Sequence, residues 1–100
     1  MVVGHIDLPM SALVNVCRKY QVRELSLFGS ALRDDFRDDS DIDLLVEFIP
    51  GHSIGFIEYL DCQMELTEVL GRKVDLVDKQ GVKPRLANRI LGNAKVLYSN

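Results

Sequence analysis

The sequence lacks the features of several large classes of protein. Charged residues interrupt every apolar stretch well short of a membrane span, and the first residues do not run from positive charge into an apolar segment as in a signal peptide. There is no internal repeat and no linker-like segment, and 100 residues leave no room for a separate substrate-recognition domain. We therefore expect one cytoplasmic domain over residues 1–100, which does not enter membranes and meets large substrates through its own surface or a partner.

Positive charge and cysteine are also scarce. The formal net charge is -3, whereas a protein that wraps nucleic acid needs a cationic surface, so the balance argues against nucleic acid as a main partner. Cys17 and Cys62 each lie in an amphipathic pattern, which favours buried free thiols over a disulfide. His5 and His52 have no partner at ligand spacing and are expected at the surface rather than in catalysis.

The composition is that of an ordinary globular domain, with 47% hydrophobic and 27% charged residues. Apolar periodicity and turn residues predict the order of the elements. These are a helix from Pro9 to about Tyr20, a strand over 24–28, a helical turn over 30–33, a strand over 41–48, a helix over 54–70 stopped by Gly71, a strand over 74–77, a helix from Pro84 and a strand over 95–98.

The longest expected helix carries an apolar stripe. Ile57, Leu60, Met64 and Leu70 recur at roughly helical intervals within residues 54–70. A stripe of this kind normally faces the core of a small domain. We therefore expect these four side chains to be buried.

Two carboxylates stand one residue apart at the start of the strand over residues 41–48. Residues i and i+2 of a strand point to the same face, so Asp41 and Asp43 present oxygens from one rigid element. Mg²⁺ prefers such ligands and completes its shell with water and substrate phosphates. The spacing therefore predicts a metal site. Glu47 continues the same face but lies farther along, and we expect it to be solvated or paired with Arg or Lys.

A third carboxylate, Asp75, lies inside the apolar strand over residues 74–77. An isolated charge in a hydrophobic run needs a compensating partner. If this strand pairs beside residues 41–48, that partner is the metal site, and Asp41, Asp43 and Asp75 together hold the metal.

A glycine-serine turn precedes the two carboxylates. Gly29 would let the backbone approach a phosphate closely, and Ser30 offers a hydroxyl and can cap a helical turn whose free amides face the same anion. Arg33 would add a forked cation to the phosphates or pair with the aspartates that follow it. Phe36, in the polar connection that follows, is an exposed aromatic candidate for base stacking or partner contact.

These parts suit one reaction, the in-line attack of an acceptor hydroxyl on the α-phosphate of a nucleoside triphosphate with pyrophosphate leaving. Two Mg²⁺ ions would clamp the attacking and departing oxygens. Asp75, as the carboxylate nearest the acceptor, would also help to activate the hydroxyl. We therefore predict Asp41, Asp43 and Asp75 as catalytic and metal-binding residues.

At these residues the chain resembles the DNA polymerase beta-like nucleotidyltransferase superfamily, and most closely its minimal nucleotidyltransferase (MNT) branch. That branch has a Gly-Ser turn, ten residues and Asp-x-Asp, which residues 29–43 match without a gap. Arg33 matches an arginine usual after the turn, residues 74–77 resemble the strand of the third aspartate, and residues 84–98 resemble the closing helix and strand. Where the family often has glycine after the arginine, this chain has Asp34 and Asp35, whose charge would weaken nucleotide affinity.

The resemblance implies an α+β fold, a small mixed β-sheet flanked by helices. It also implies an antitoxin of a HEPN/MNT toxin–antitoxin pair, which transfers AMP from ATP to a tyrosine of a small helical HEPN-domain toxin. An alternative is a non-catalytic antitoxin that neutralises the helical partner by covering it. Transfer to a small molecule or an RNA end is a third interpretation, which the acidic balance and short chain disfavour. Homo- and hetero-oligomers are both compatible with the sequence.

Overall fold

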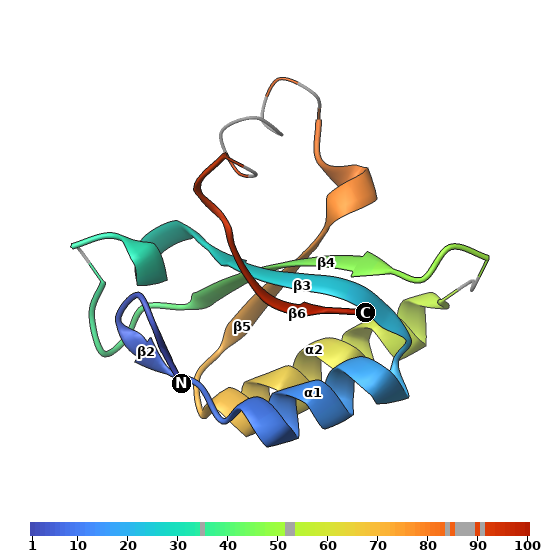
Figure 1. Cartoon of the computed structure of the whole chain (residues 1–100), viewed down its shortest axis with the longest axis horizontal. Helices are drawn as coiled ribbons and strands as arrows, with labels where there is room; N and C mark the ends of the chain where they lie inside the picture. Colours follow the sequence, from blue (N-terminus) through green and yellow to red (C-terminus); the bar gives the residue numbers. More distant parts are fainter. Residues whose placement is uncertain (35, 52–53, 84, 86–89, 91) are drawn as a thin grey trace.

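Two helices cover one face of a four-stranded mixed sheet (Figure 1). The computed structural model describes residues 1–34, 36–51, 54–83, 85, 90 and 92–100. The strands β3 (Val22–Phe28), β4 (Ile42–Phe48), β5 (Val74–Asp78) and β6 (Lys95–Ser99) lie in the order β5-β4-β3-β6. β3 is antiparallel to β4 and β6, while β4 and β5 are parallel. The predicted mixed sheet with flanking helices is confirmed.

The remaining elements are helices and a small hairpin. They are β1 (Val2–Val3), β2 (Ile6–Asp7), α1 (Met10–Lys19), the 3₁₀ turns η1 (Gly29–Leu32) and η2 (Lys79–Gly81), and α2 (Phe56–Leu70). The helix expected from Pro84 falls mostly on residues outside the described part of the chain. Within that part, no helix has the length and apolar character needed to cross a membrane.

The crossover from β4 through α2 to β5 places the third carboxylate. Parallel neighbours cannot be joined by a tight turn, so the chain crosses over through a helix. Gly71 ends α2 in the left-handed conformation with φ 69°, as its role as a stop signal predicted. The chain then enters β5 alongside β4, which is the pairing on which the predicted site depends.

The core lies between the sheet and the two helices. Alternate residues of β4 point toward the helices, and Ile42, Leu44 and Val46 are fully buried there. Each such aliphatic side chain contributes about 1.5–3 kcal/mol through its burial. Cys17 of α1 and Cys62 of α2 are buried and free, as predicted, and burial raises the pKa of each thiol to about 12.

The prediction for the stripe of α2 is wrong for three of its four residues. Ile57, Leu60 and Met64 are 74%, 40% and 62% exposed, whereas Cys62 and Leu66 of the same helix are buried against the sheet. α2 has apolar residues on both sides, so helical spacing alone cannot indicate which side faces the core. The geometry of the crossover decides it.

Candidate active site

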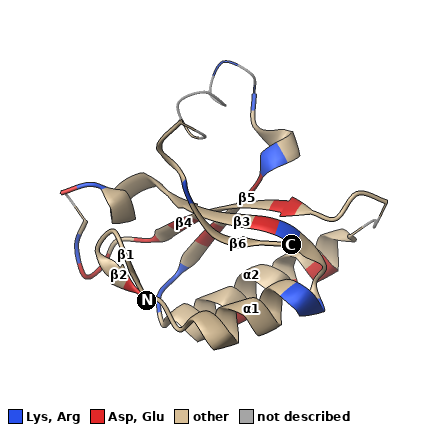
Figure 2. Ribbon diagram, in the orientation of Figure 1, with Lys and Arg blue, Asp and Glu red and all other residues tan. Residues whose placement is uncertain are grey.

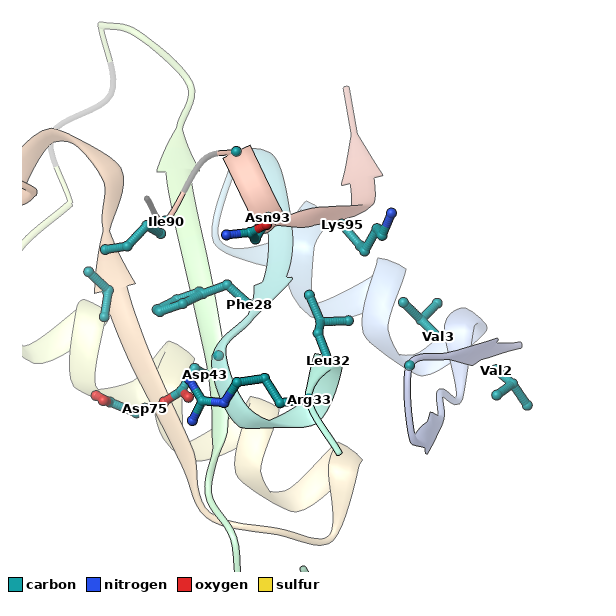
Figure 3. Close-up of a pocket in the computed structure, with 14 residues that line it drawn as sticks. Val2, Val3, Phe28, Leu32, Arg33, Asp43, Asp75, Ile90, Asn93 and Lys95 are labelled. Carbon is teal, nitrogen blue, oxygen red and sulfur yellow. The ribbon is translucent and has the colours of Figure 1, made fainter. Parts of the chain in front are cut away.

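Asp43 and Asp75 lie directly opposite each other on β4 and β5. Both belong to the set of strand residues that alternates with the buried Ile42, Leu44 and Val74. Their side chains therefore point away from the two helices, to the other face of the sheet (Figure 3). The sheet thus brings together the second and third predicted carboxylates from positions 32 residues apart in the sequence.

Gly29 at the end of β3 lies against the carboxylate of Asp43. Phe28 pairs with Asp43 in the sheet, so the chain turns immediately beside it. A β-carbon on Gly29 would overlap the Asp43 carboxylate, lying 2.9 Å from its Cγ, and Gly29 also has φ +74°. Both the backbone conformation and the close approach therefore require glycine here. Packing against Asp43 is therefore sufficient to explain the glycine of the sequence motif, without a bound phosphate.

Ser30 does not cap a helical turn, and this prediction is wrong. η1 includes Ser30 as a helical residue, and its N-cap residue is Phe28, with no side-chain capping hydrogen bond. The Ser30 hydroxyl instead donates to the carbonyl oxygen of Asp41 at 3.4 Å, and its backbone N–H donates to the Asp43 carboxylate. Ser30 therefore ties the turn to both aspartates. Its predicted contact with a phosphate stays a prediction.

The pKa of Asp43 is raised above its ordinary value. Burial is the largest cause, and the negative charges of Asp75 and Asp41 also raise it, while the hydrogen bond from Ser30 and the charge of Arg33 lower it. A carboxylate that is half-buried beside two others is a site of concentrated negative charge. Binding of a cation would relieve this repulsion.

Arg33 extends from the end of η1 toward Asp43 and Asp75 (Figure 3). Its charge is close enough to Asp43 to lower the pKa of that carboxyl. Arg33 also lines the pocket beside the two aspartates. The structure thus places Arg33 beside the pocket, and its predicted contact with a phosphate stays a prediction.

Asp41 forms an ion pair with Lys73, and neither residue lines the pocket beside Asp43 and Asp75. Asp41 is half exposed just before β4, and its carboxylate lies 4.0 Å from Nζ of Lys73. An ion pair this exposed contributes about 1 kcal/mol at most, so it does not fix Asp41 in this orientation. Across the described residues, no three His, Cys, Asp or Glu side chains are gathered closely enough to hold a metal ion.

The donor chemistry of the site nevertheless suits Mg²⁺. This ion is commonly held by one or two carboxylates, with substrate phosphates and water completing its shell. Asp43 and Asp75 supply two carboxylates from adjacent strands, and burial together with the charge of Asp75 raises the pKa of Asp43. A change in the side-chain orientation of Asp41 would add a third.

The carboxylates form one wall of an open pocket with a volume of about 1000 Å³ (Figure 3). Its wall combines charged groups with apolar side chains from the N-terminal hairpin, η1, the sheet and the segment before β6. The lining residues are Val2, Val3, Gly4, Phe28, Gly29, Leu32, Arg33, Asp43, Asp75, Val77, Ile90, Gly92, Asn93 and Lys95. Neither Ser30 nor Asp41 is among them.

The hairpin of β1 and β2 is a part of this pocket that the sequence analysis did not predict. Gly4, with φ +59°, packs so closely on η1 that a β-carbon would clash with the carbonyl of Ala31, and the N–H of His5 donates to that carbonyl at 3.0 Å. This contact sets Val2 and Val3 against the pocket. Two short apolar runs around Gly4 are a typical hairpin signal and could have indicated it.

The loop between η1 and β4 is held by Arg72. Its Nη1 donates to the carbonyl oxygens of Arg37 and Ser40 at 2.9 and 3.2 Å, and its guanidinium lies 4.5 Å from the ring centroid of Phe36. Phe36 was expected to be exposed, but it is half-buried against the core and also stacks on His5. The loop that leads into Asp41 is therefore anchored at its middle.

Glu47 lies at the far end of β4 from these groups. Its carboxylate pairs with Arg23 at 3.9 Å, which confirms the expected ion pair with an arginine or lysine. It does not line the pocket. Glu47 is therefore a carboxylate on the same strand that does not belong to the candidate site.

The arrangement of sheet, turn and paired aspartates defines a nucleotidyltransferase domain. The model of the polymerase beta nucleotidyltransferase family matches residues 11–100, so the chain belongs to this family. The N-terminal hairpin, which lines the pocket, precedes the matched region.

Two curated relatives have related names. The chain is 38% identical to MJ0435 of Methanocaldococcus jannaschii, a candidate protein adenylyltransferase, over 82% of this chain and 86% of that protein. It is 36% identical to the protein adenylyltransferase MntA of Thermococcus cleftensis, over 73% of this chain and 72% of that protein. Both similarities span most of the domain.

Solved structures agree on the fold. A candidate minimal nucleotidyltransferase superposes with a TM-score of 0.72 at 32% identity, covering 86% of each chain. A complex of a tri-AMPylated Shewanella oneidensis HEPN toxin with its MNT antitoxin matches with a TM-score of 0.65, covering 91% of this chain and 70% of that one. At 22% identity, the second similarity shows the shared fold alone.

Proposed function

We propose that this nucleotidyltransferase is a Mg²⁺-dependent protein adenylyltransferase, which transfers AMP from ATP to a tyrosine hydroxyl of a helical HEPN-domain toxin and so acts as its antitoxin. The observation that carries the proposal is the pairing of Asp43 and Asp75 across β4 and β5, beneath the turn at Gly29. The names of the relatives in Methanocaldococcus and Thermococcus support the protein acceptor. A chain in the complex of the HEPN toxin with its MNT antitoxin shares this fold, which supports the choice of partner.

Different residues of the chain have separate roles in the proposed reaction. The acceptor oxygen attacks the α-phosphorus, a new phosphorus–oxygen bond forms, and the bond to the departing pyrophosphate breaks. Asp75, which is exposed in the pocket, accepts the proton of the acceptor hydroxyl. Arg33 lies where it can contact phosphate oxygens with its forked donors.

The carboxylates would hold the metal. Asp43 and Asp75 would contribute ligands first, and Asp41 would join them by leaving its weak pair with Lys73. Mg²⁺ bound there would supply charge that neutralises the phosphates and polarises the reacting phosphorus. The hydrogen bond from the Ser30 backbone keeps the Asp43 carboxylate oriented while this charge balance changes.

A second function is favoured by one observation. Asp41 faces Lys73, and no three potential ligands are gathered among the residues that the structure describes. A chain in which this arrangement persisted would neutralise a helical partner by covering it, without transferring a nucleotide.

Intact-mass spectrometry of the partner separates the two functions. The HEPN-domain partner is incubated with this chain, ATP and Mg²⁺, alongside Asp43→Asn and Glu47→Gln variants. Transfer predicts a mass gain of one or more AMP groups with the wild type and with Glu47→Gln, whose carboxylate lies outside the pocket, but none with Asp43→Asn. A stable complex with no mass gain would exclude catalysis and favour neutralisation by binding.

A further inference from the structure

α2 presents an apolar stripe to solvent. Phe56, Ile57, Leu60 and Met64 are exposed by 77%, 74%, 40% and 62%, and their spacing places them along one side of the helix. We refer to these four residues as the outer stripe of α2. Its opposite side already packs on the sheet through Cys62 and Leu66, so the outer stripe has no role in the core.

The neighbouring helix shows what an ordinary surface helix looks like in this protein. α1 packs beside α2 on the same face of the sheet (Figure 1). It buries Leu13, Val16 and Cys17, and its solvent side carries Ser11, Asn15 and Arg18. A helix with apolar residues on both sides is usually covered on both. Contiguous exposed apolar side chains on a small domain mark an interaction surface.

Acidic residues border the outer stripe. Asp61 and Glu68 are exposed and lie one turn beyond Ile57 and Met64. α2 contains four acidic residues and no Lys or Arg, whereas the last turn of α1 is basic (Figure 2). Glu65 is already paired with Lys19 at 3.0 Å. Because this border is acidic and exposed, we expect a partner that covers the outer stripe to carry positive charge beside it.

This border disfavours a second copy of the chain as the occupant. Around a two-fold axis, an interface pairs each surface with itself. Two antiparallel α2 helices would therefore set the acidic border of one copy, with Asp61 and Glu68, against the same border of the other. Like charges opposed in this way repel each other.

The outer stripe lies on the opposite side of the molecule from the pocket. α2 covers one face of the sheet, and Asp43 and Asp75 open onto the other (Figures 1 and 3). A partner seated on α2 therefore leaves the pocket open. Docking and transfer are separated in space, so substitution of Asp43 can remove transfer without removing docking.

We propose that the outer stripe of α2 is a docking surface for an α-helix of the partner protein, a helix whose own apolar stripe is bordered by Lys or Arg. The inference rests on the proposed function, because it takes the helical HEPN-domain protein as the partner. An amphipathic helix laid along an apolar surface is a common mode of recognition, and its charged border sets orientation and specificity.

The test is the affinity of the full chain for the purified HEPN-domain protein, measured by titration calorimetry. Ile57→Gln combined with Met64→Gln should raise Kd at least tenfold, because buried apolar anchors dominate such interfaces. Val96→Gln, at a 55% exposed valine on β6, is the matched control and should leave Kd within about twofold. Asp61→Lys combined with Glu68→Lys should weaken binding and reduce its dependence on salt.

The outcomes are distinguishable. Binding that is unchanged in the Ile57→Gln, Met64→Gln variant overturns the surface and leaves the proposed function intact. Binding without salt dependence overturns the basic border. A wild-type dimer that the same variant dissociates would make a second copy the occupant and also overturn the proposal. If the wild type neither binds nor modifies the HEPN-domain protein, the proposed function fails and this surface fails with it. Asp43→Asn should bind normally without transferring AMP.

Discussion

Gly29 leaves just enough room for the carboxylate of Asp43, and a β-carbon at this position would lie 2.9 Å from the aspartate Cγ. The turn after β3 and the carboxylate on β4 are therefore one packed unit. The same turn sends the Ser30 backbone N–H to Asp43 and aims Arg33 at the pocket. The Gly-Ser motif and the aspartates depend on each other structurally.

Gly29→Ala should reduce both stability and transfer. The alanine adopts φ +74° at a cost of about 1–2 kcal/mol and also displaces Asp43. Gly71→Ala is the matched control, because Gly71 has φ +69° but a β-carbon added there would meet no atom within 4 Å. Urea denaturation should show a larger loss in the free energy of unfolding for Gly29→Ala than for Gly71→Ala. Only Gly29→Ala should lose transfer activity. Equal losses in the two variants would argue against close packing on Asp43.

Asp43→Asn should raise the melting temperature at neutral pH in the absence of divalent cations. Because the pKa of Asp43 is raised in the folded state, the folded protein holds a proton that the unfolded chain has released, and stability falls as pH rises through this window. Asparagine removes that cost. The gain should be on the order of a few °C at pH 7 and should vanish below the ordinary pKa of 3.8.

The same variant tests the metal site. Mg²⁺ with ATP should raise the melting temperature of the wild type, because a ligand that binds only the folded state stabilises it. Asp43→Asn should show a much smaller rise. A variant that is less stable than the wild type at pH 7 without metal would contradict the inference that burial and the neighbouring carboxylates make the charged form of Asp43 unfavourable.

Lys73→Gln should lower the Mg²⁺ concentration needed for half-maximal transfer. The substitution releases Asp41 from its pair with Nζ of Lys73 and leaves it available as a ligand. The pair is exposed and 4.0 Å long, so the effect should be about two- to threefold. Titration of the transfer rate with Mg²⁺ measures it. An increased requirement would mean that Lys73 assists the site directly.

Arg72→Ala should destabilise the domain by about 1–2 kcal/mol and slow transfer. It removes two hydrogen bonds to the loop before Asp41 and the contact with Phe36. Arg72→Lys should not restore the wild type, since a lysine lacks the planar fork. Denaturation together with the Mg²⁺ dependence of transfer separates a general loss of stability from a displaced Asp41. Full rescue by lysine would mean that only the positive charge of Arg72 matters for stability and transfer.

Much of the fold follows from local patterns. Alternation over β4 placed Asp43 on the face opposite Ile42 and Leu44, and the structure has it there. Gly71 ended α2 as expected. These features depend on the period of a strand and the conformational freedom of glycine, which act between residues close in sequence.

The errors arose where distant segments meet. Ser30 looked like a helix cap, but η1 begins at Gly29, which packs on Asp43, and the Ser30 amide donates to the Asp43 carboxylate. Phe36 was expected to be exposed, but the guanidinium of Arg72, which follows α2 in the sequence, lies over its ring. Neither contact leaves a local signal, because its partner lies far along the chain.

The sequence by itself determined the candidate site residues: a glycine-serine turn, two aspartates at strand spacing and a third inside an apolar strand. Only the tertiary structure decided how these residues are arranged relative to one another. The parallel pairing of β4 and β5 put Asp75 opposite Asp43 and left Asp41 beside Lys73. The same crossover chose which apolar side of α2 would be buried. Spacing sets the direction of a side chain relative to its own element, whereas its neighbours depend on how the elements pack together.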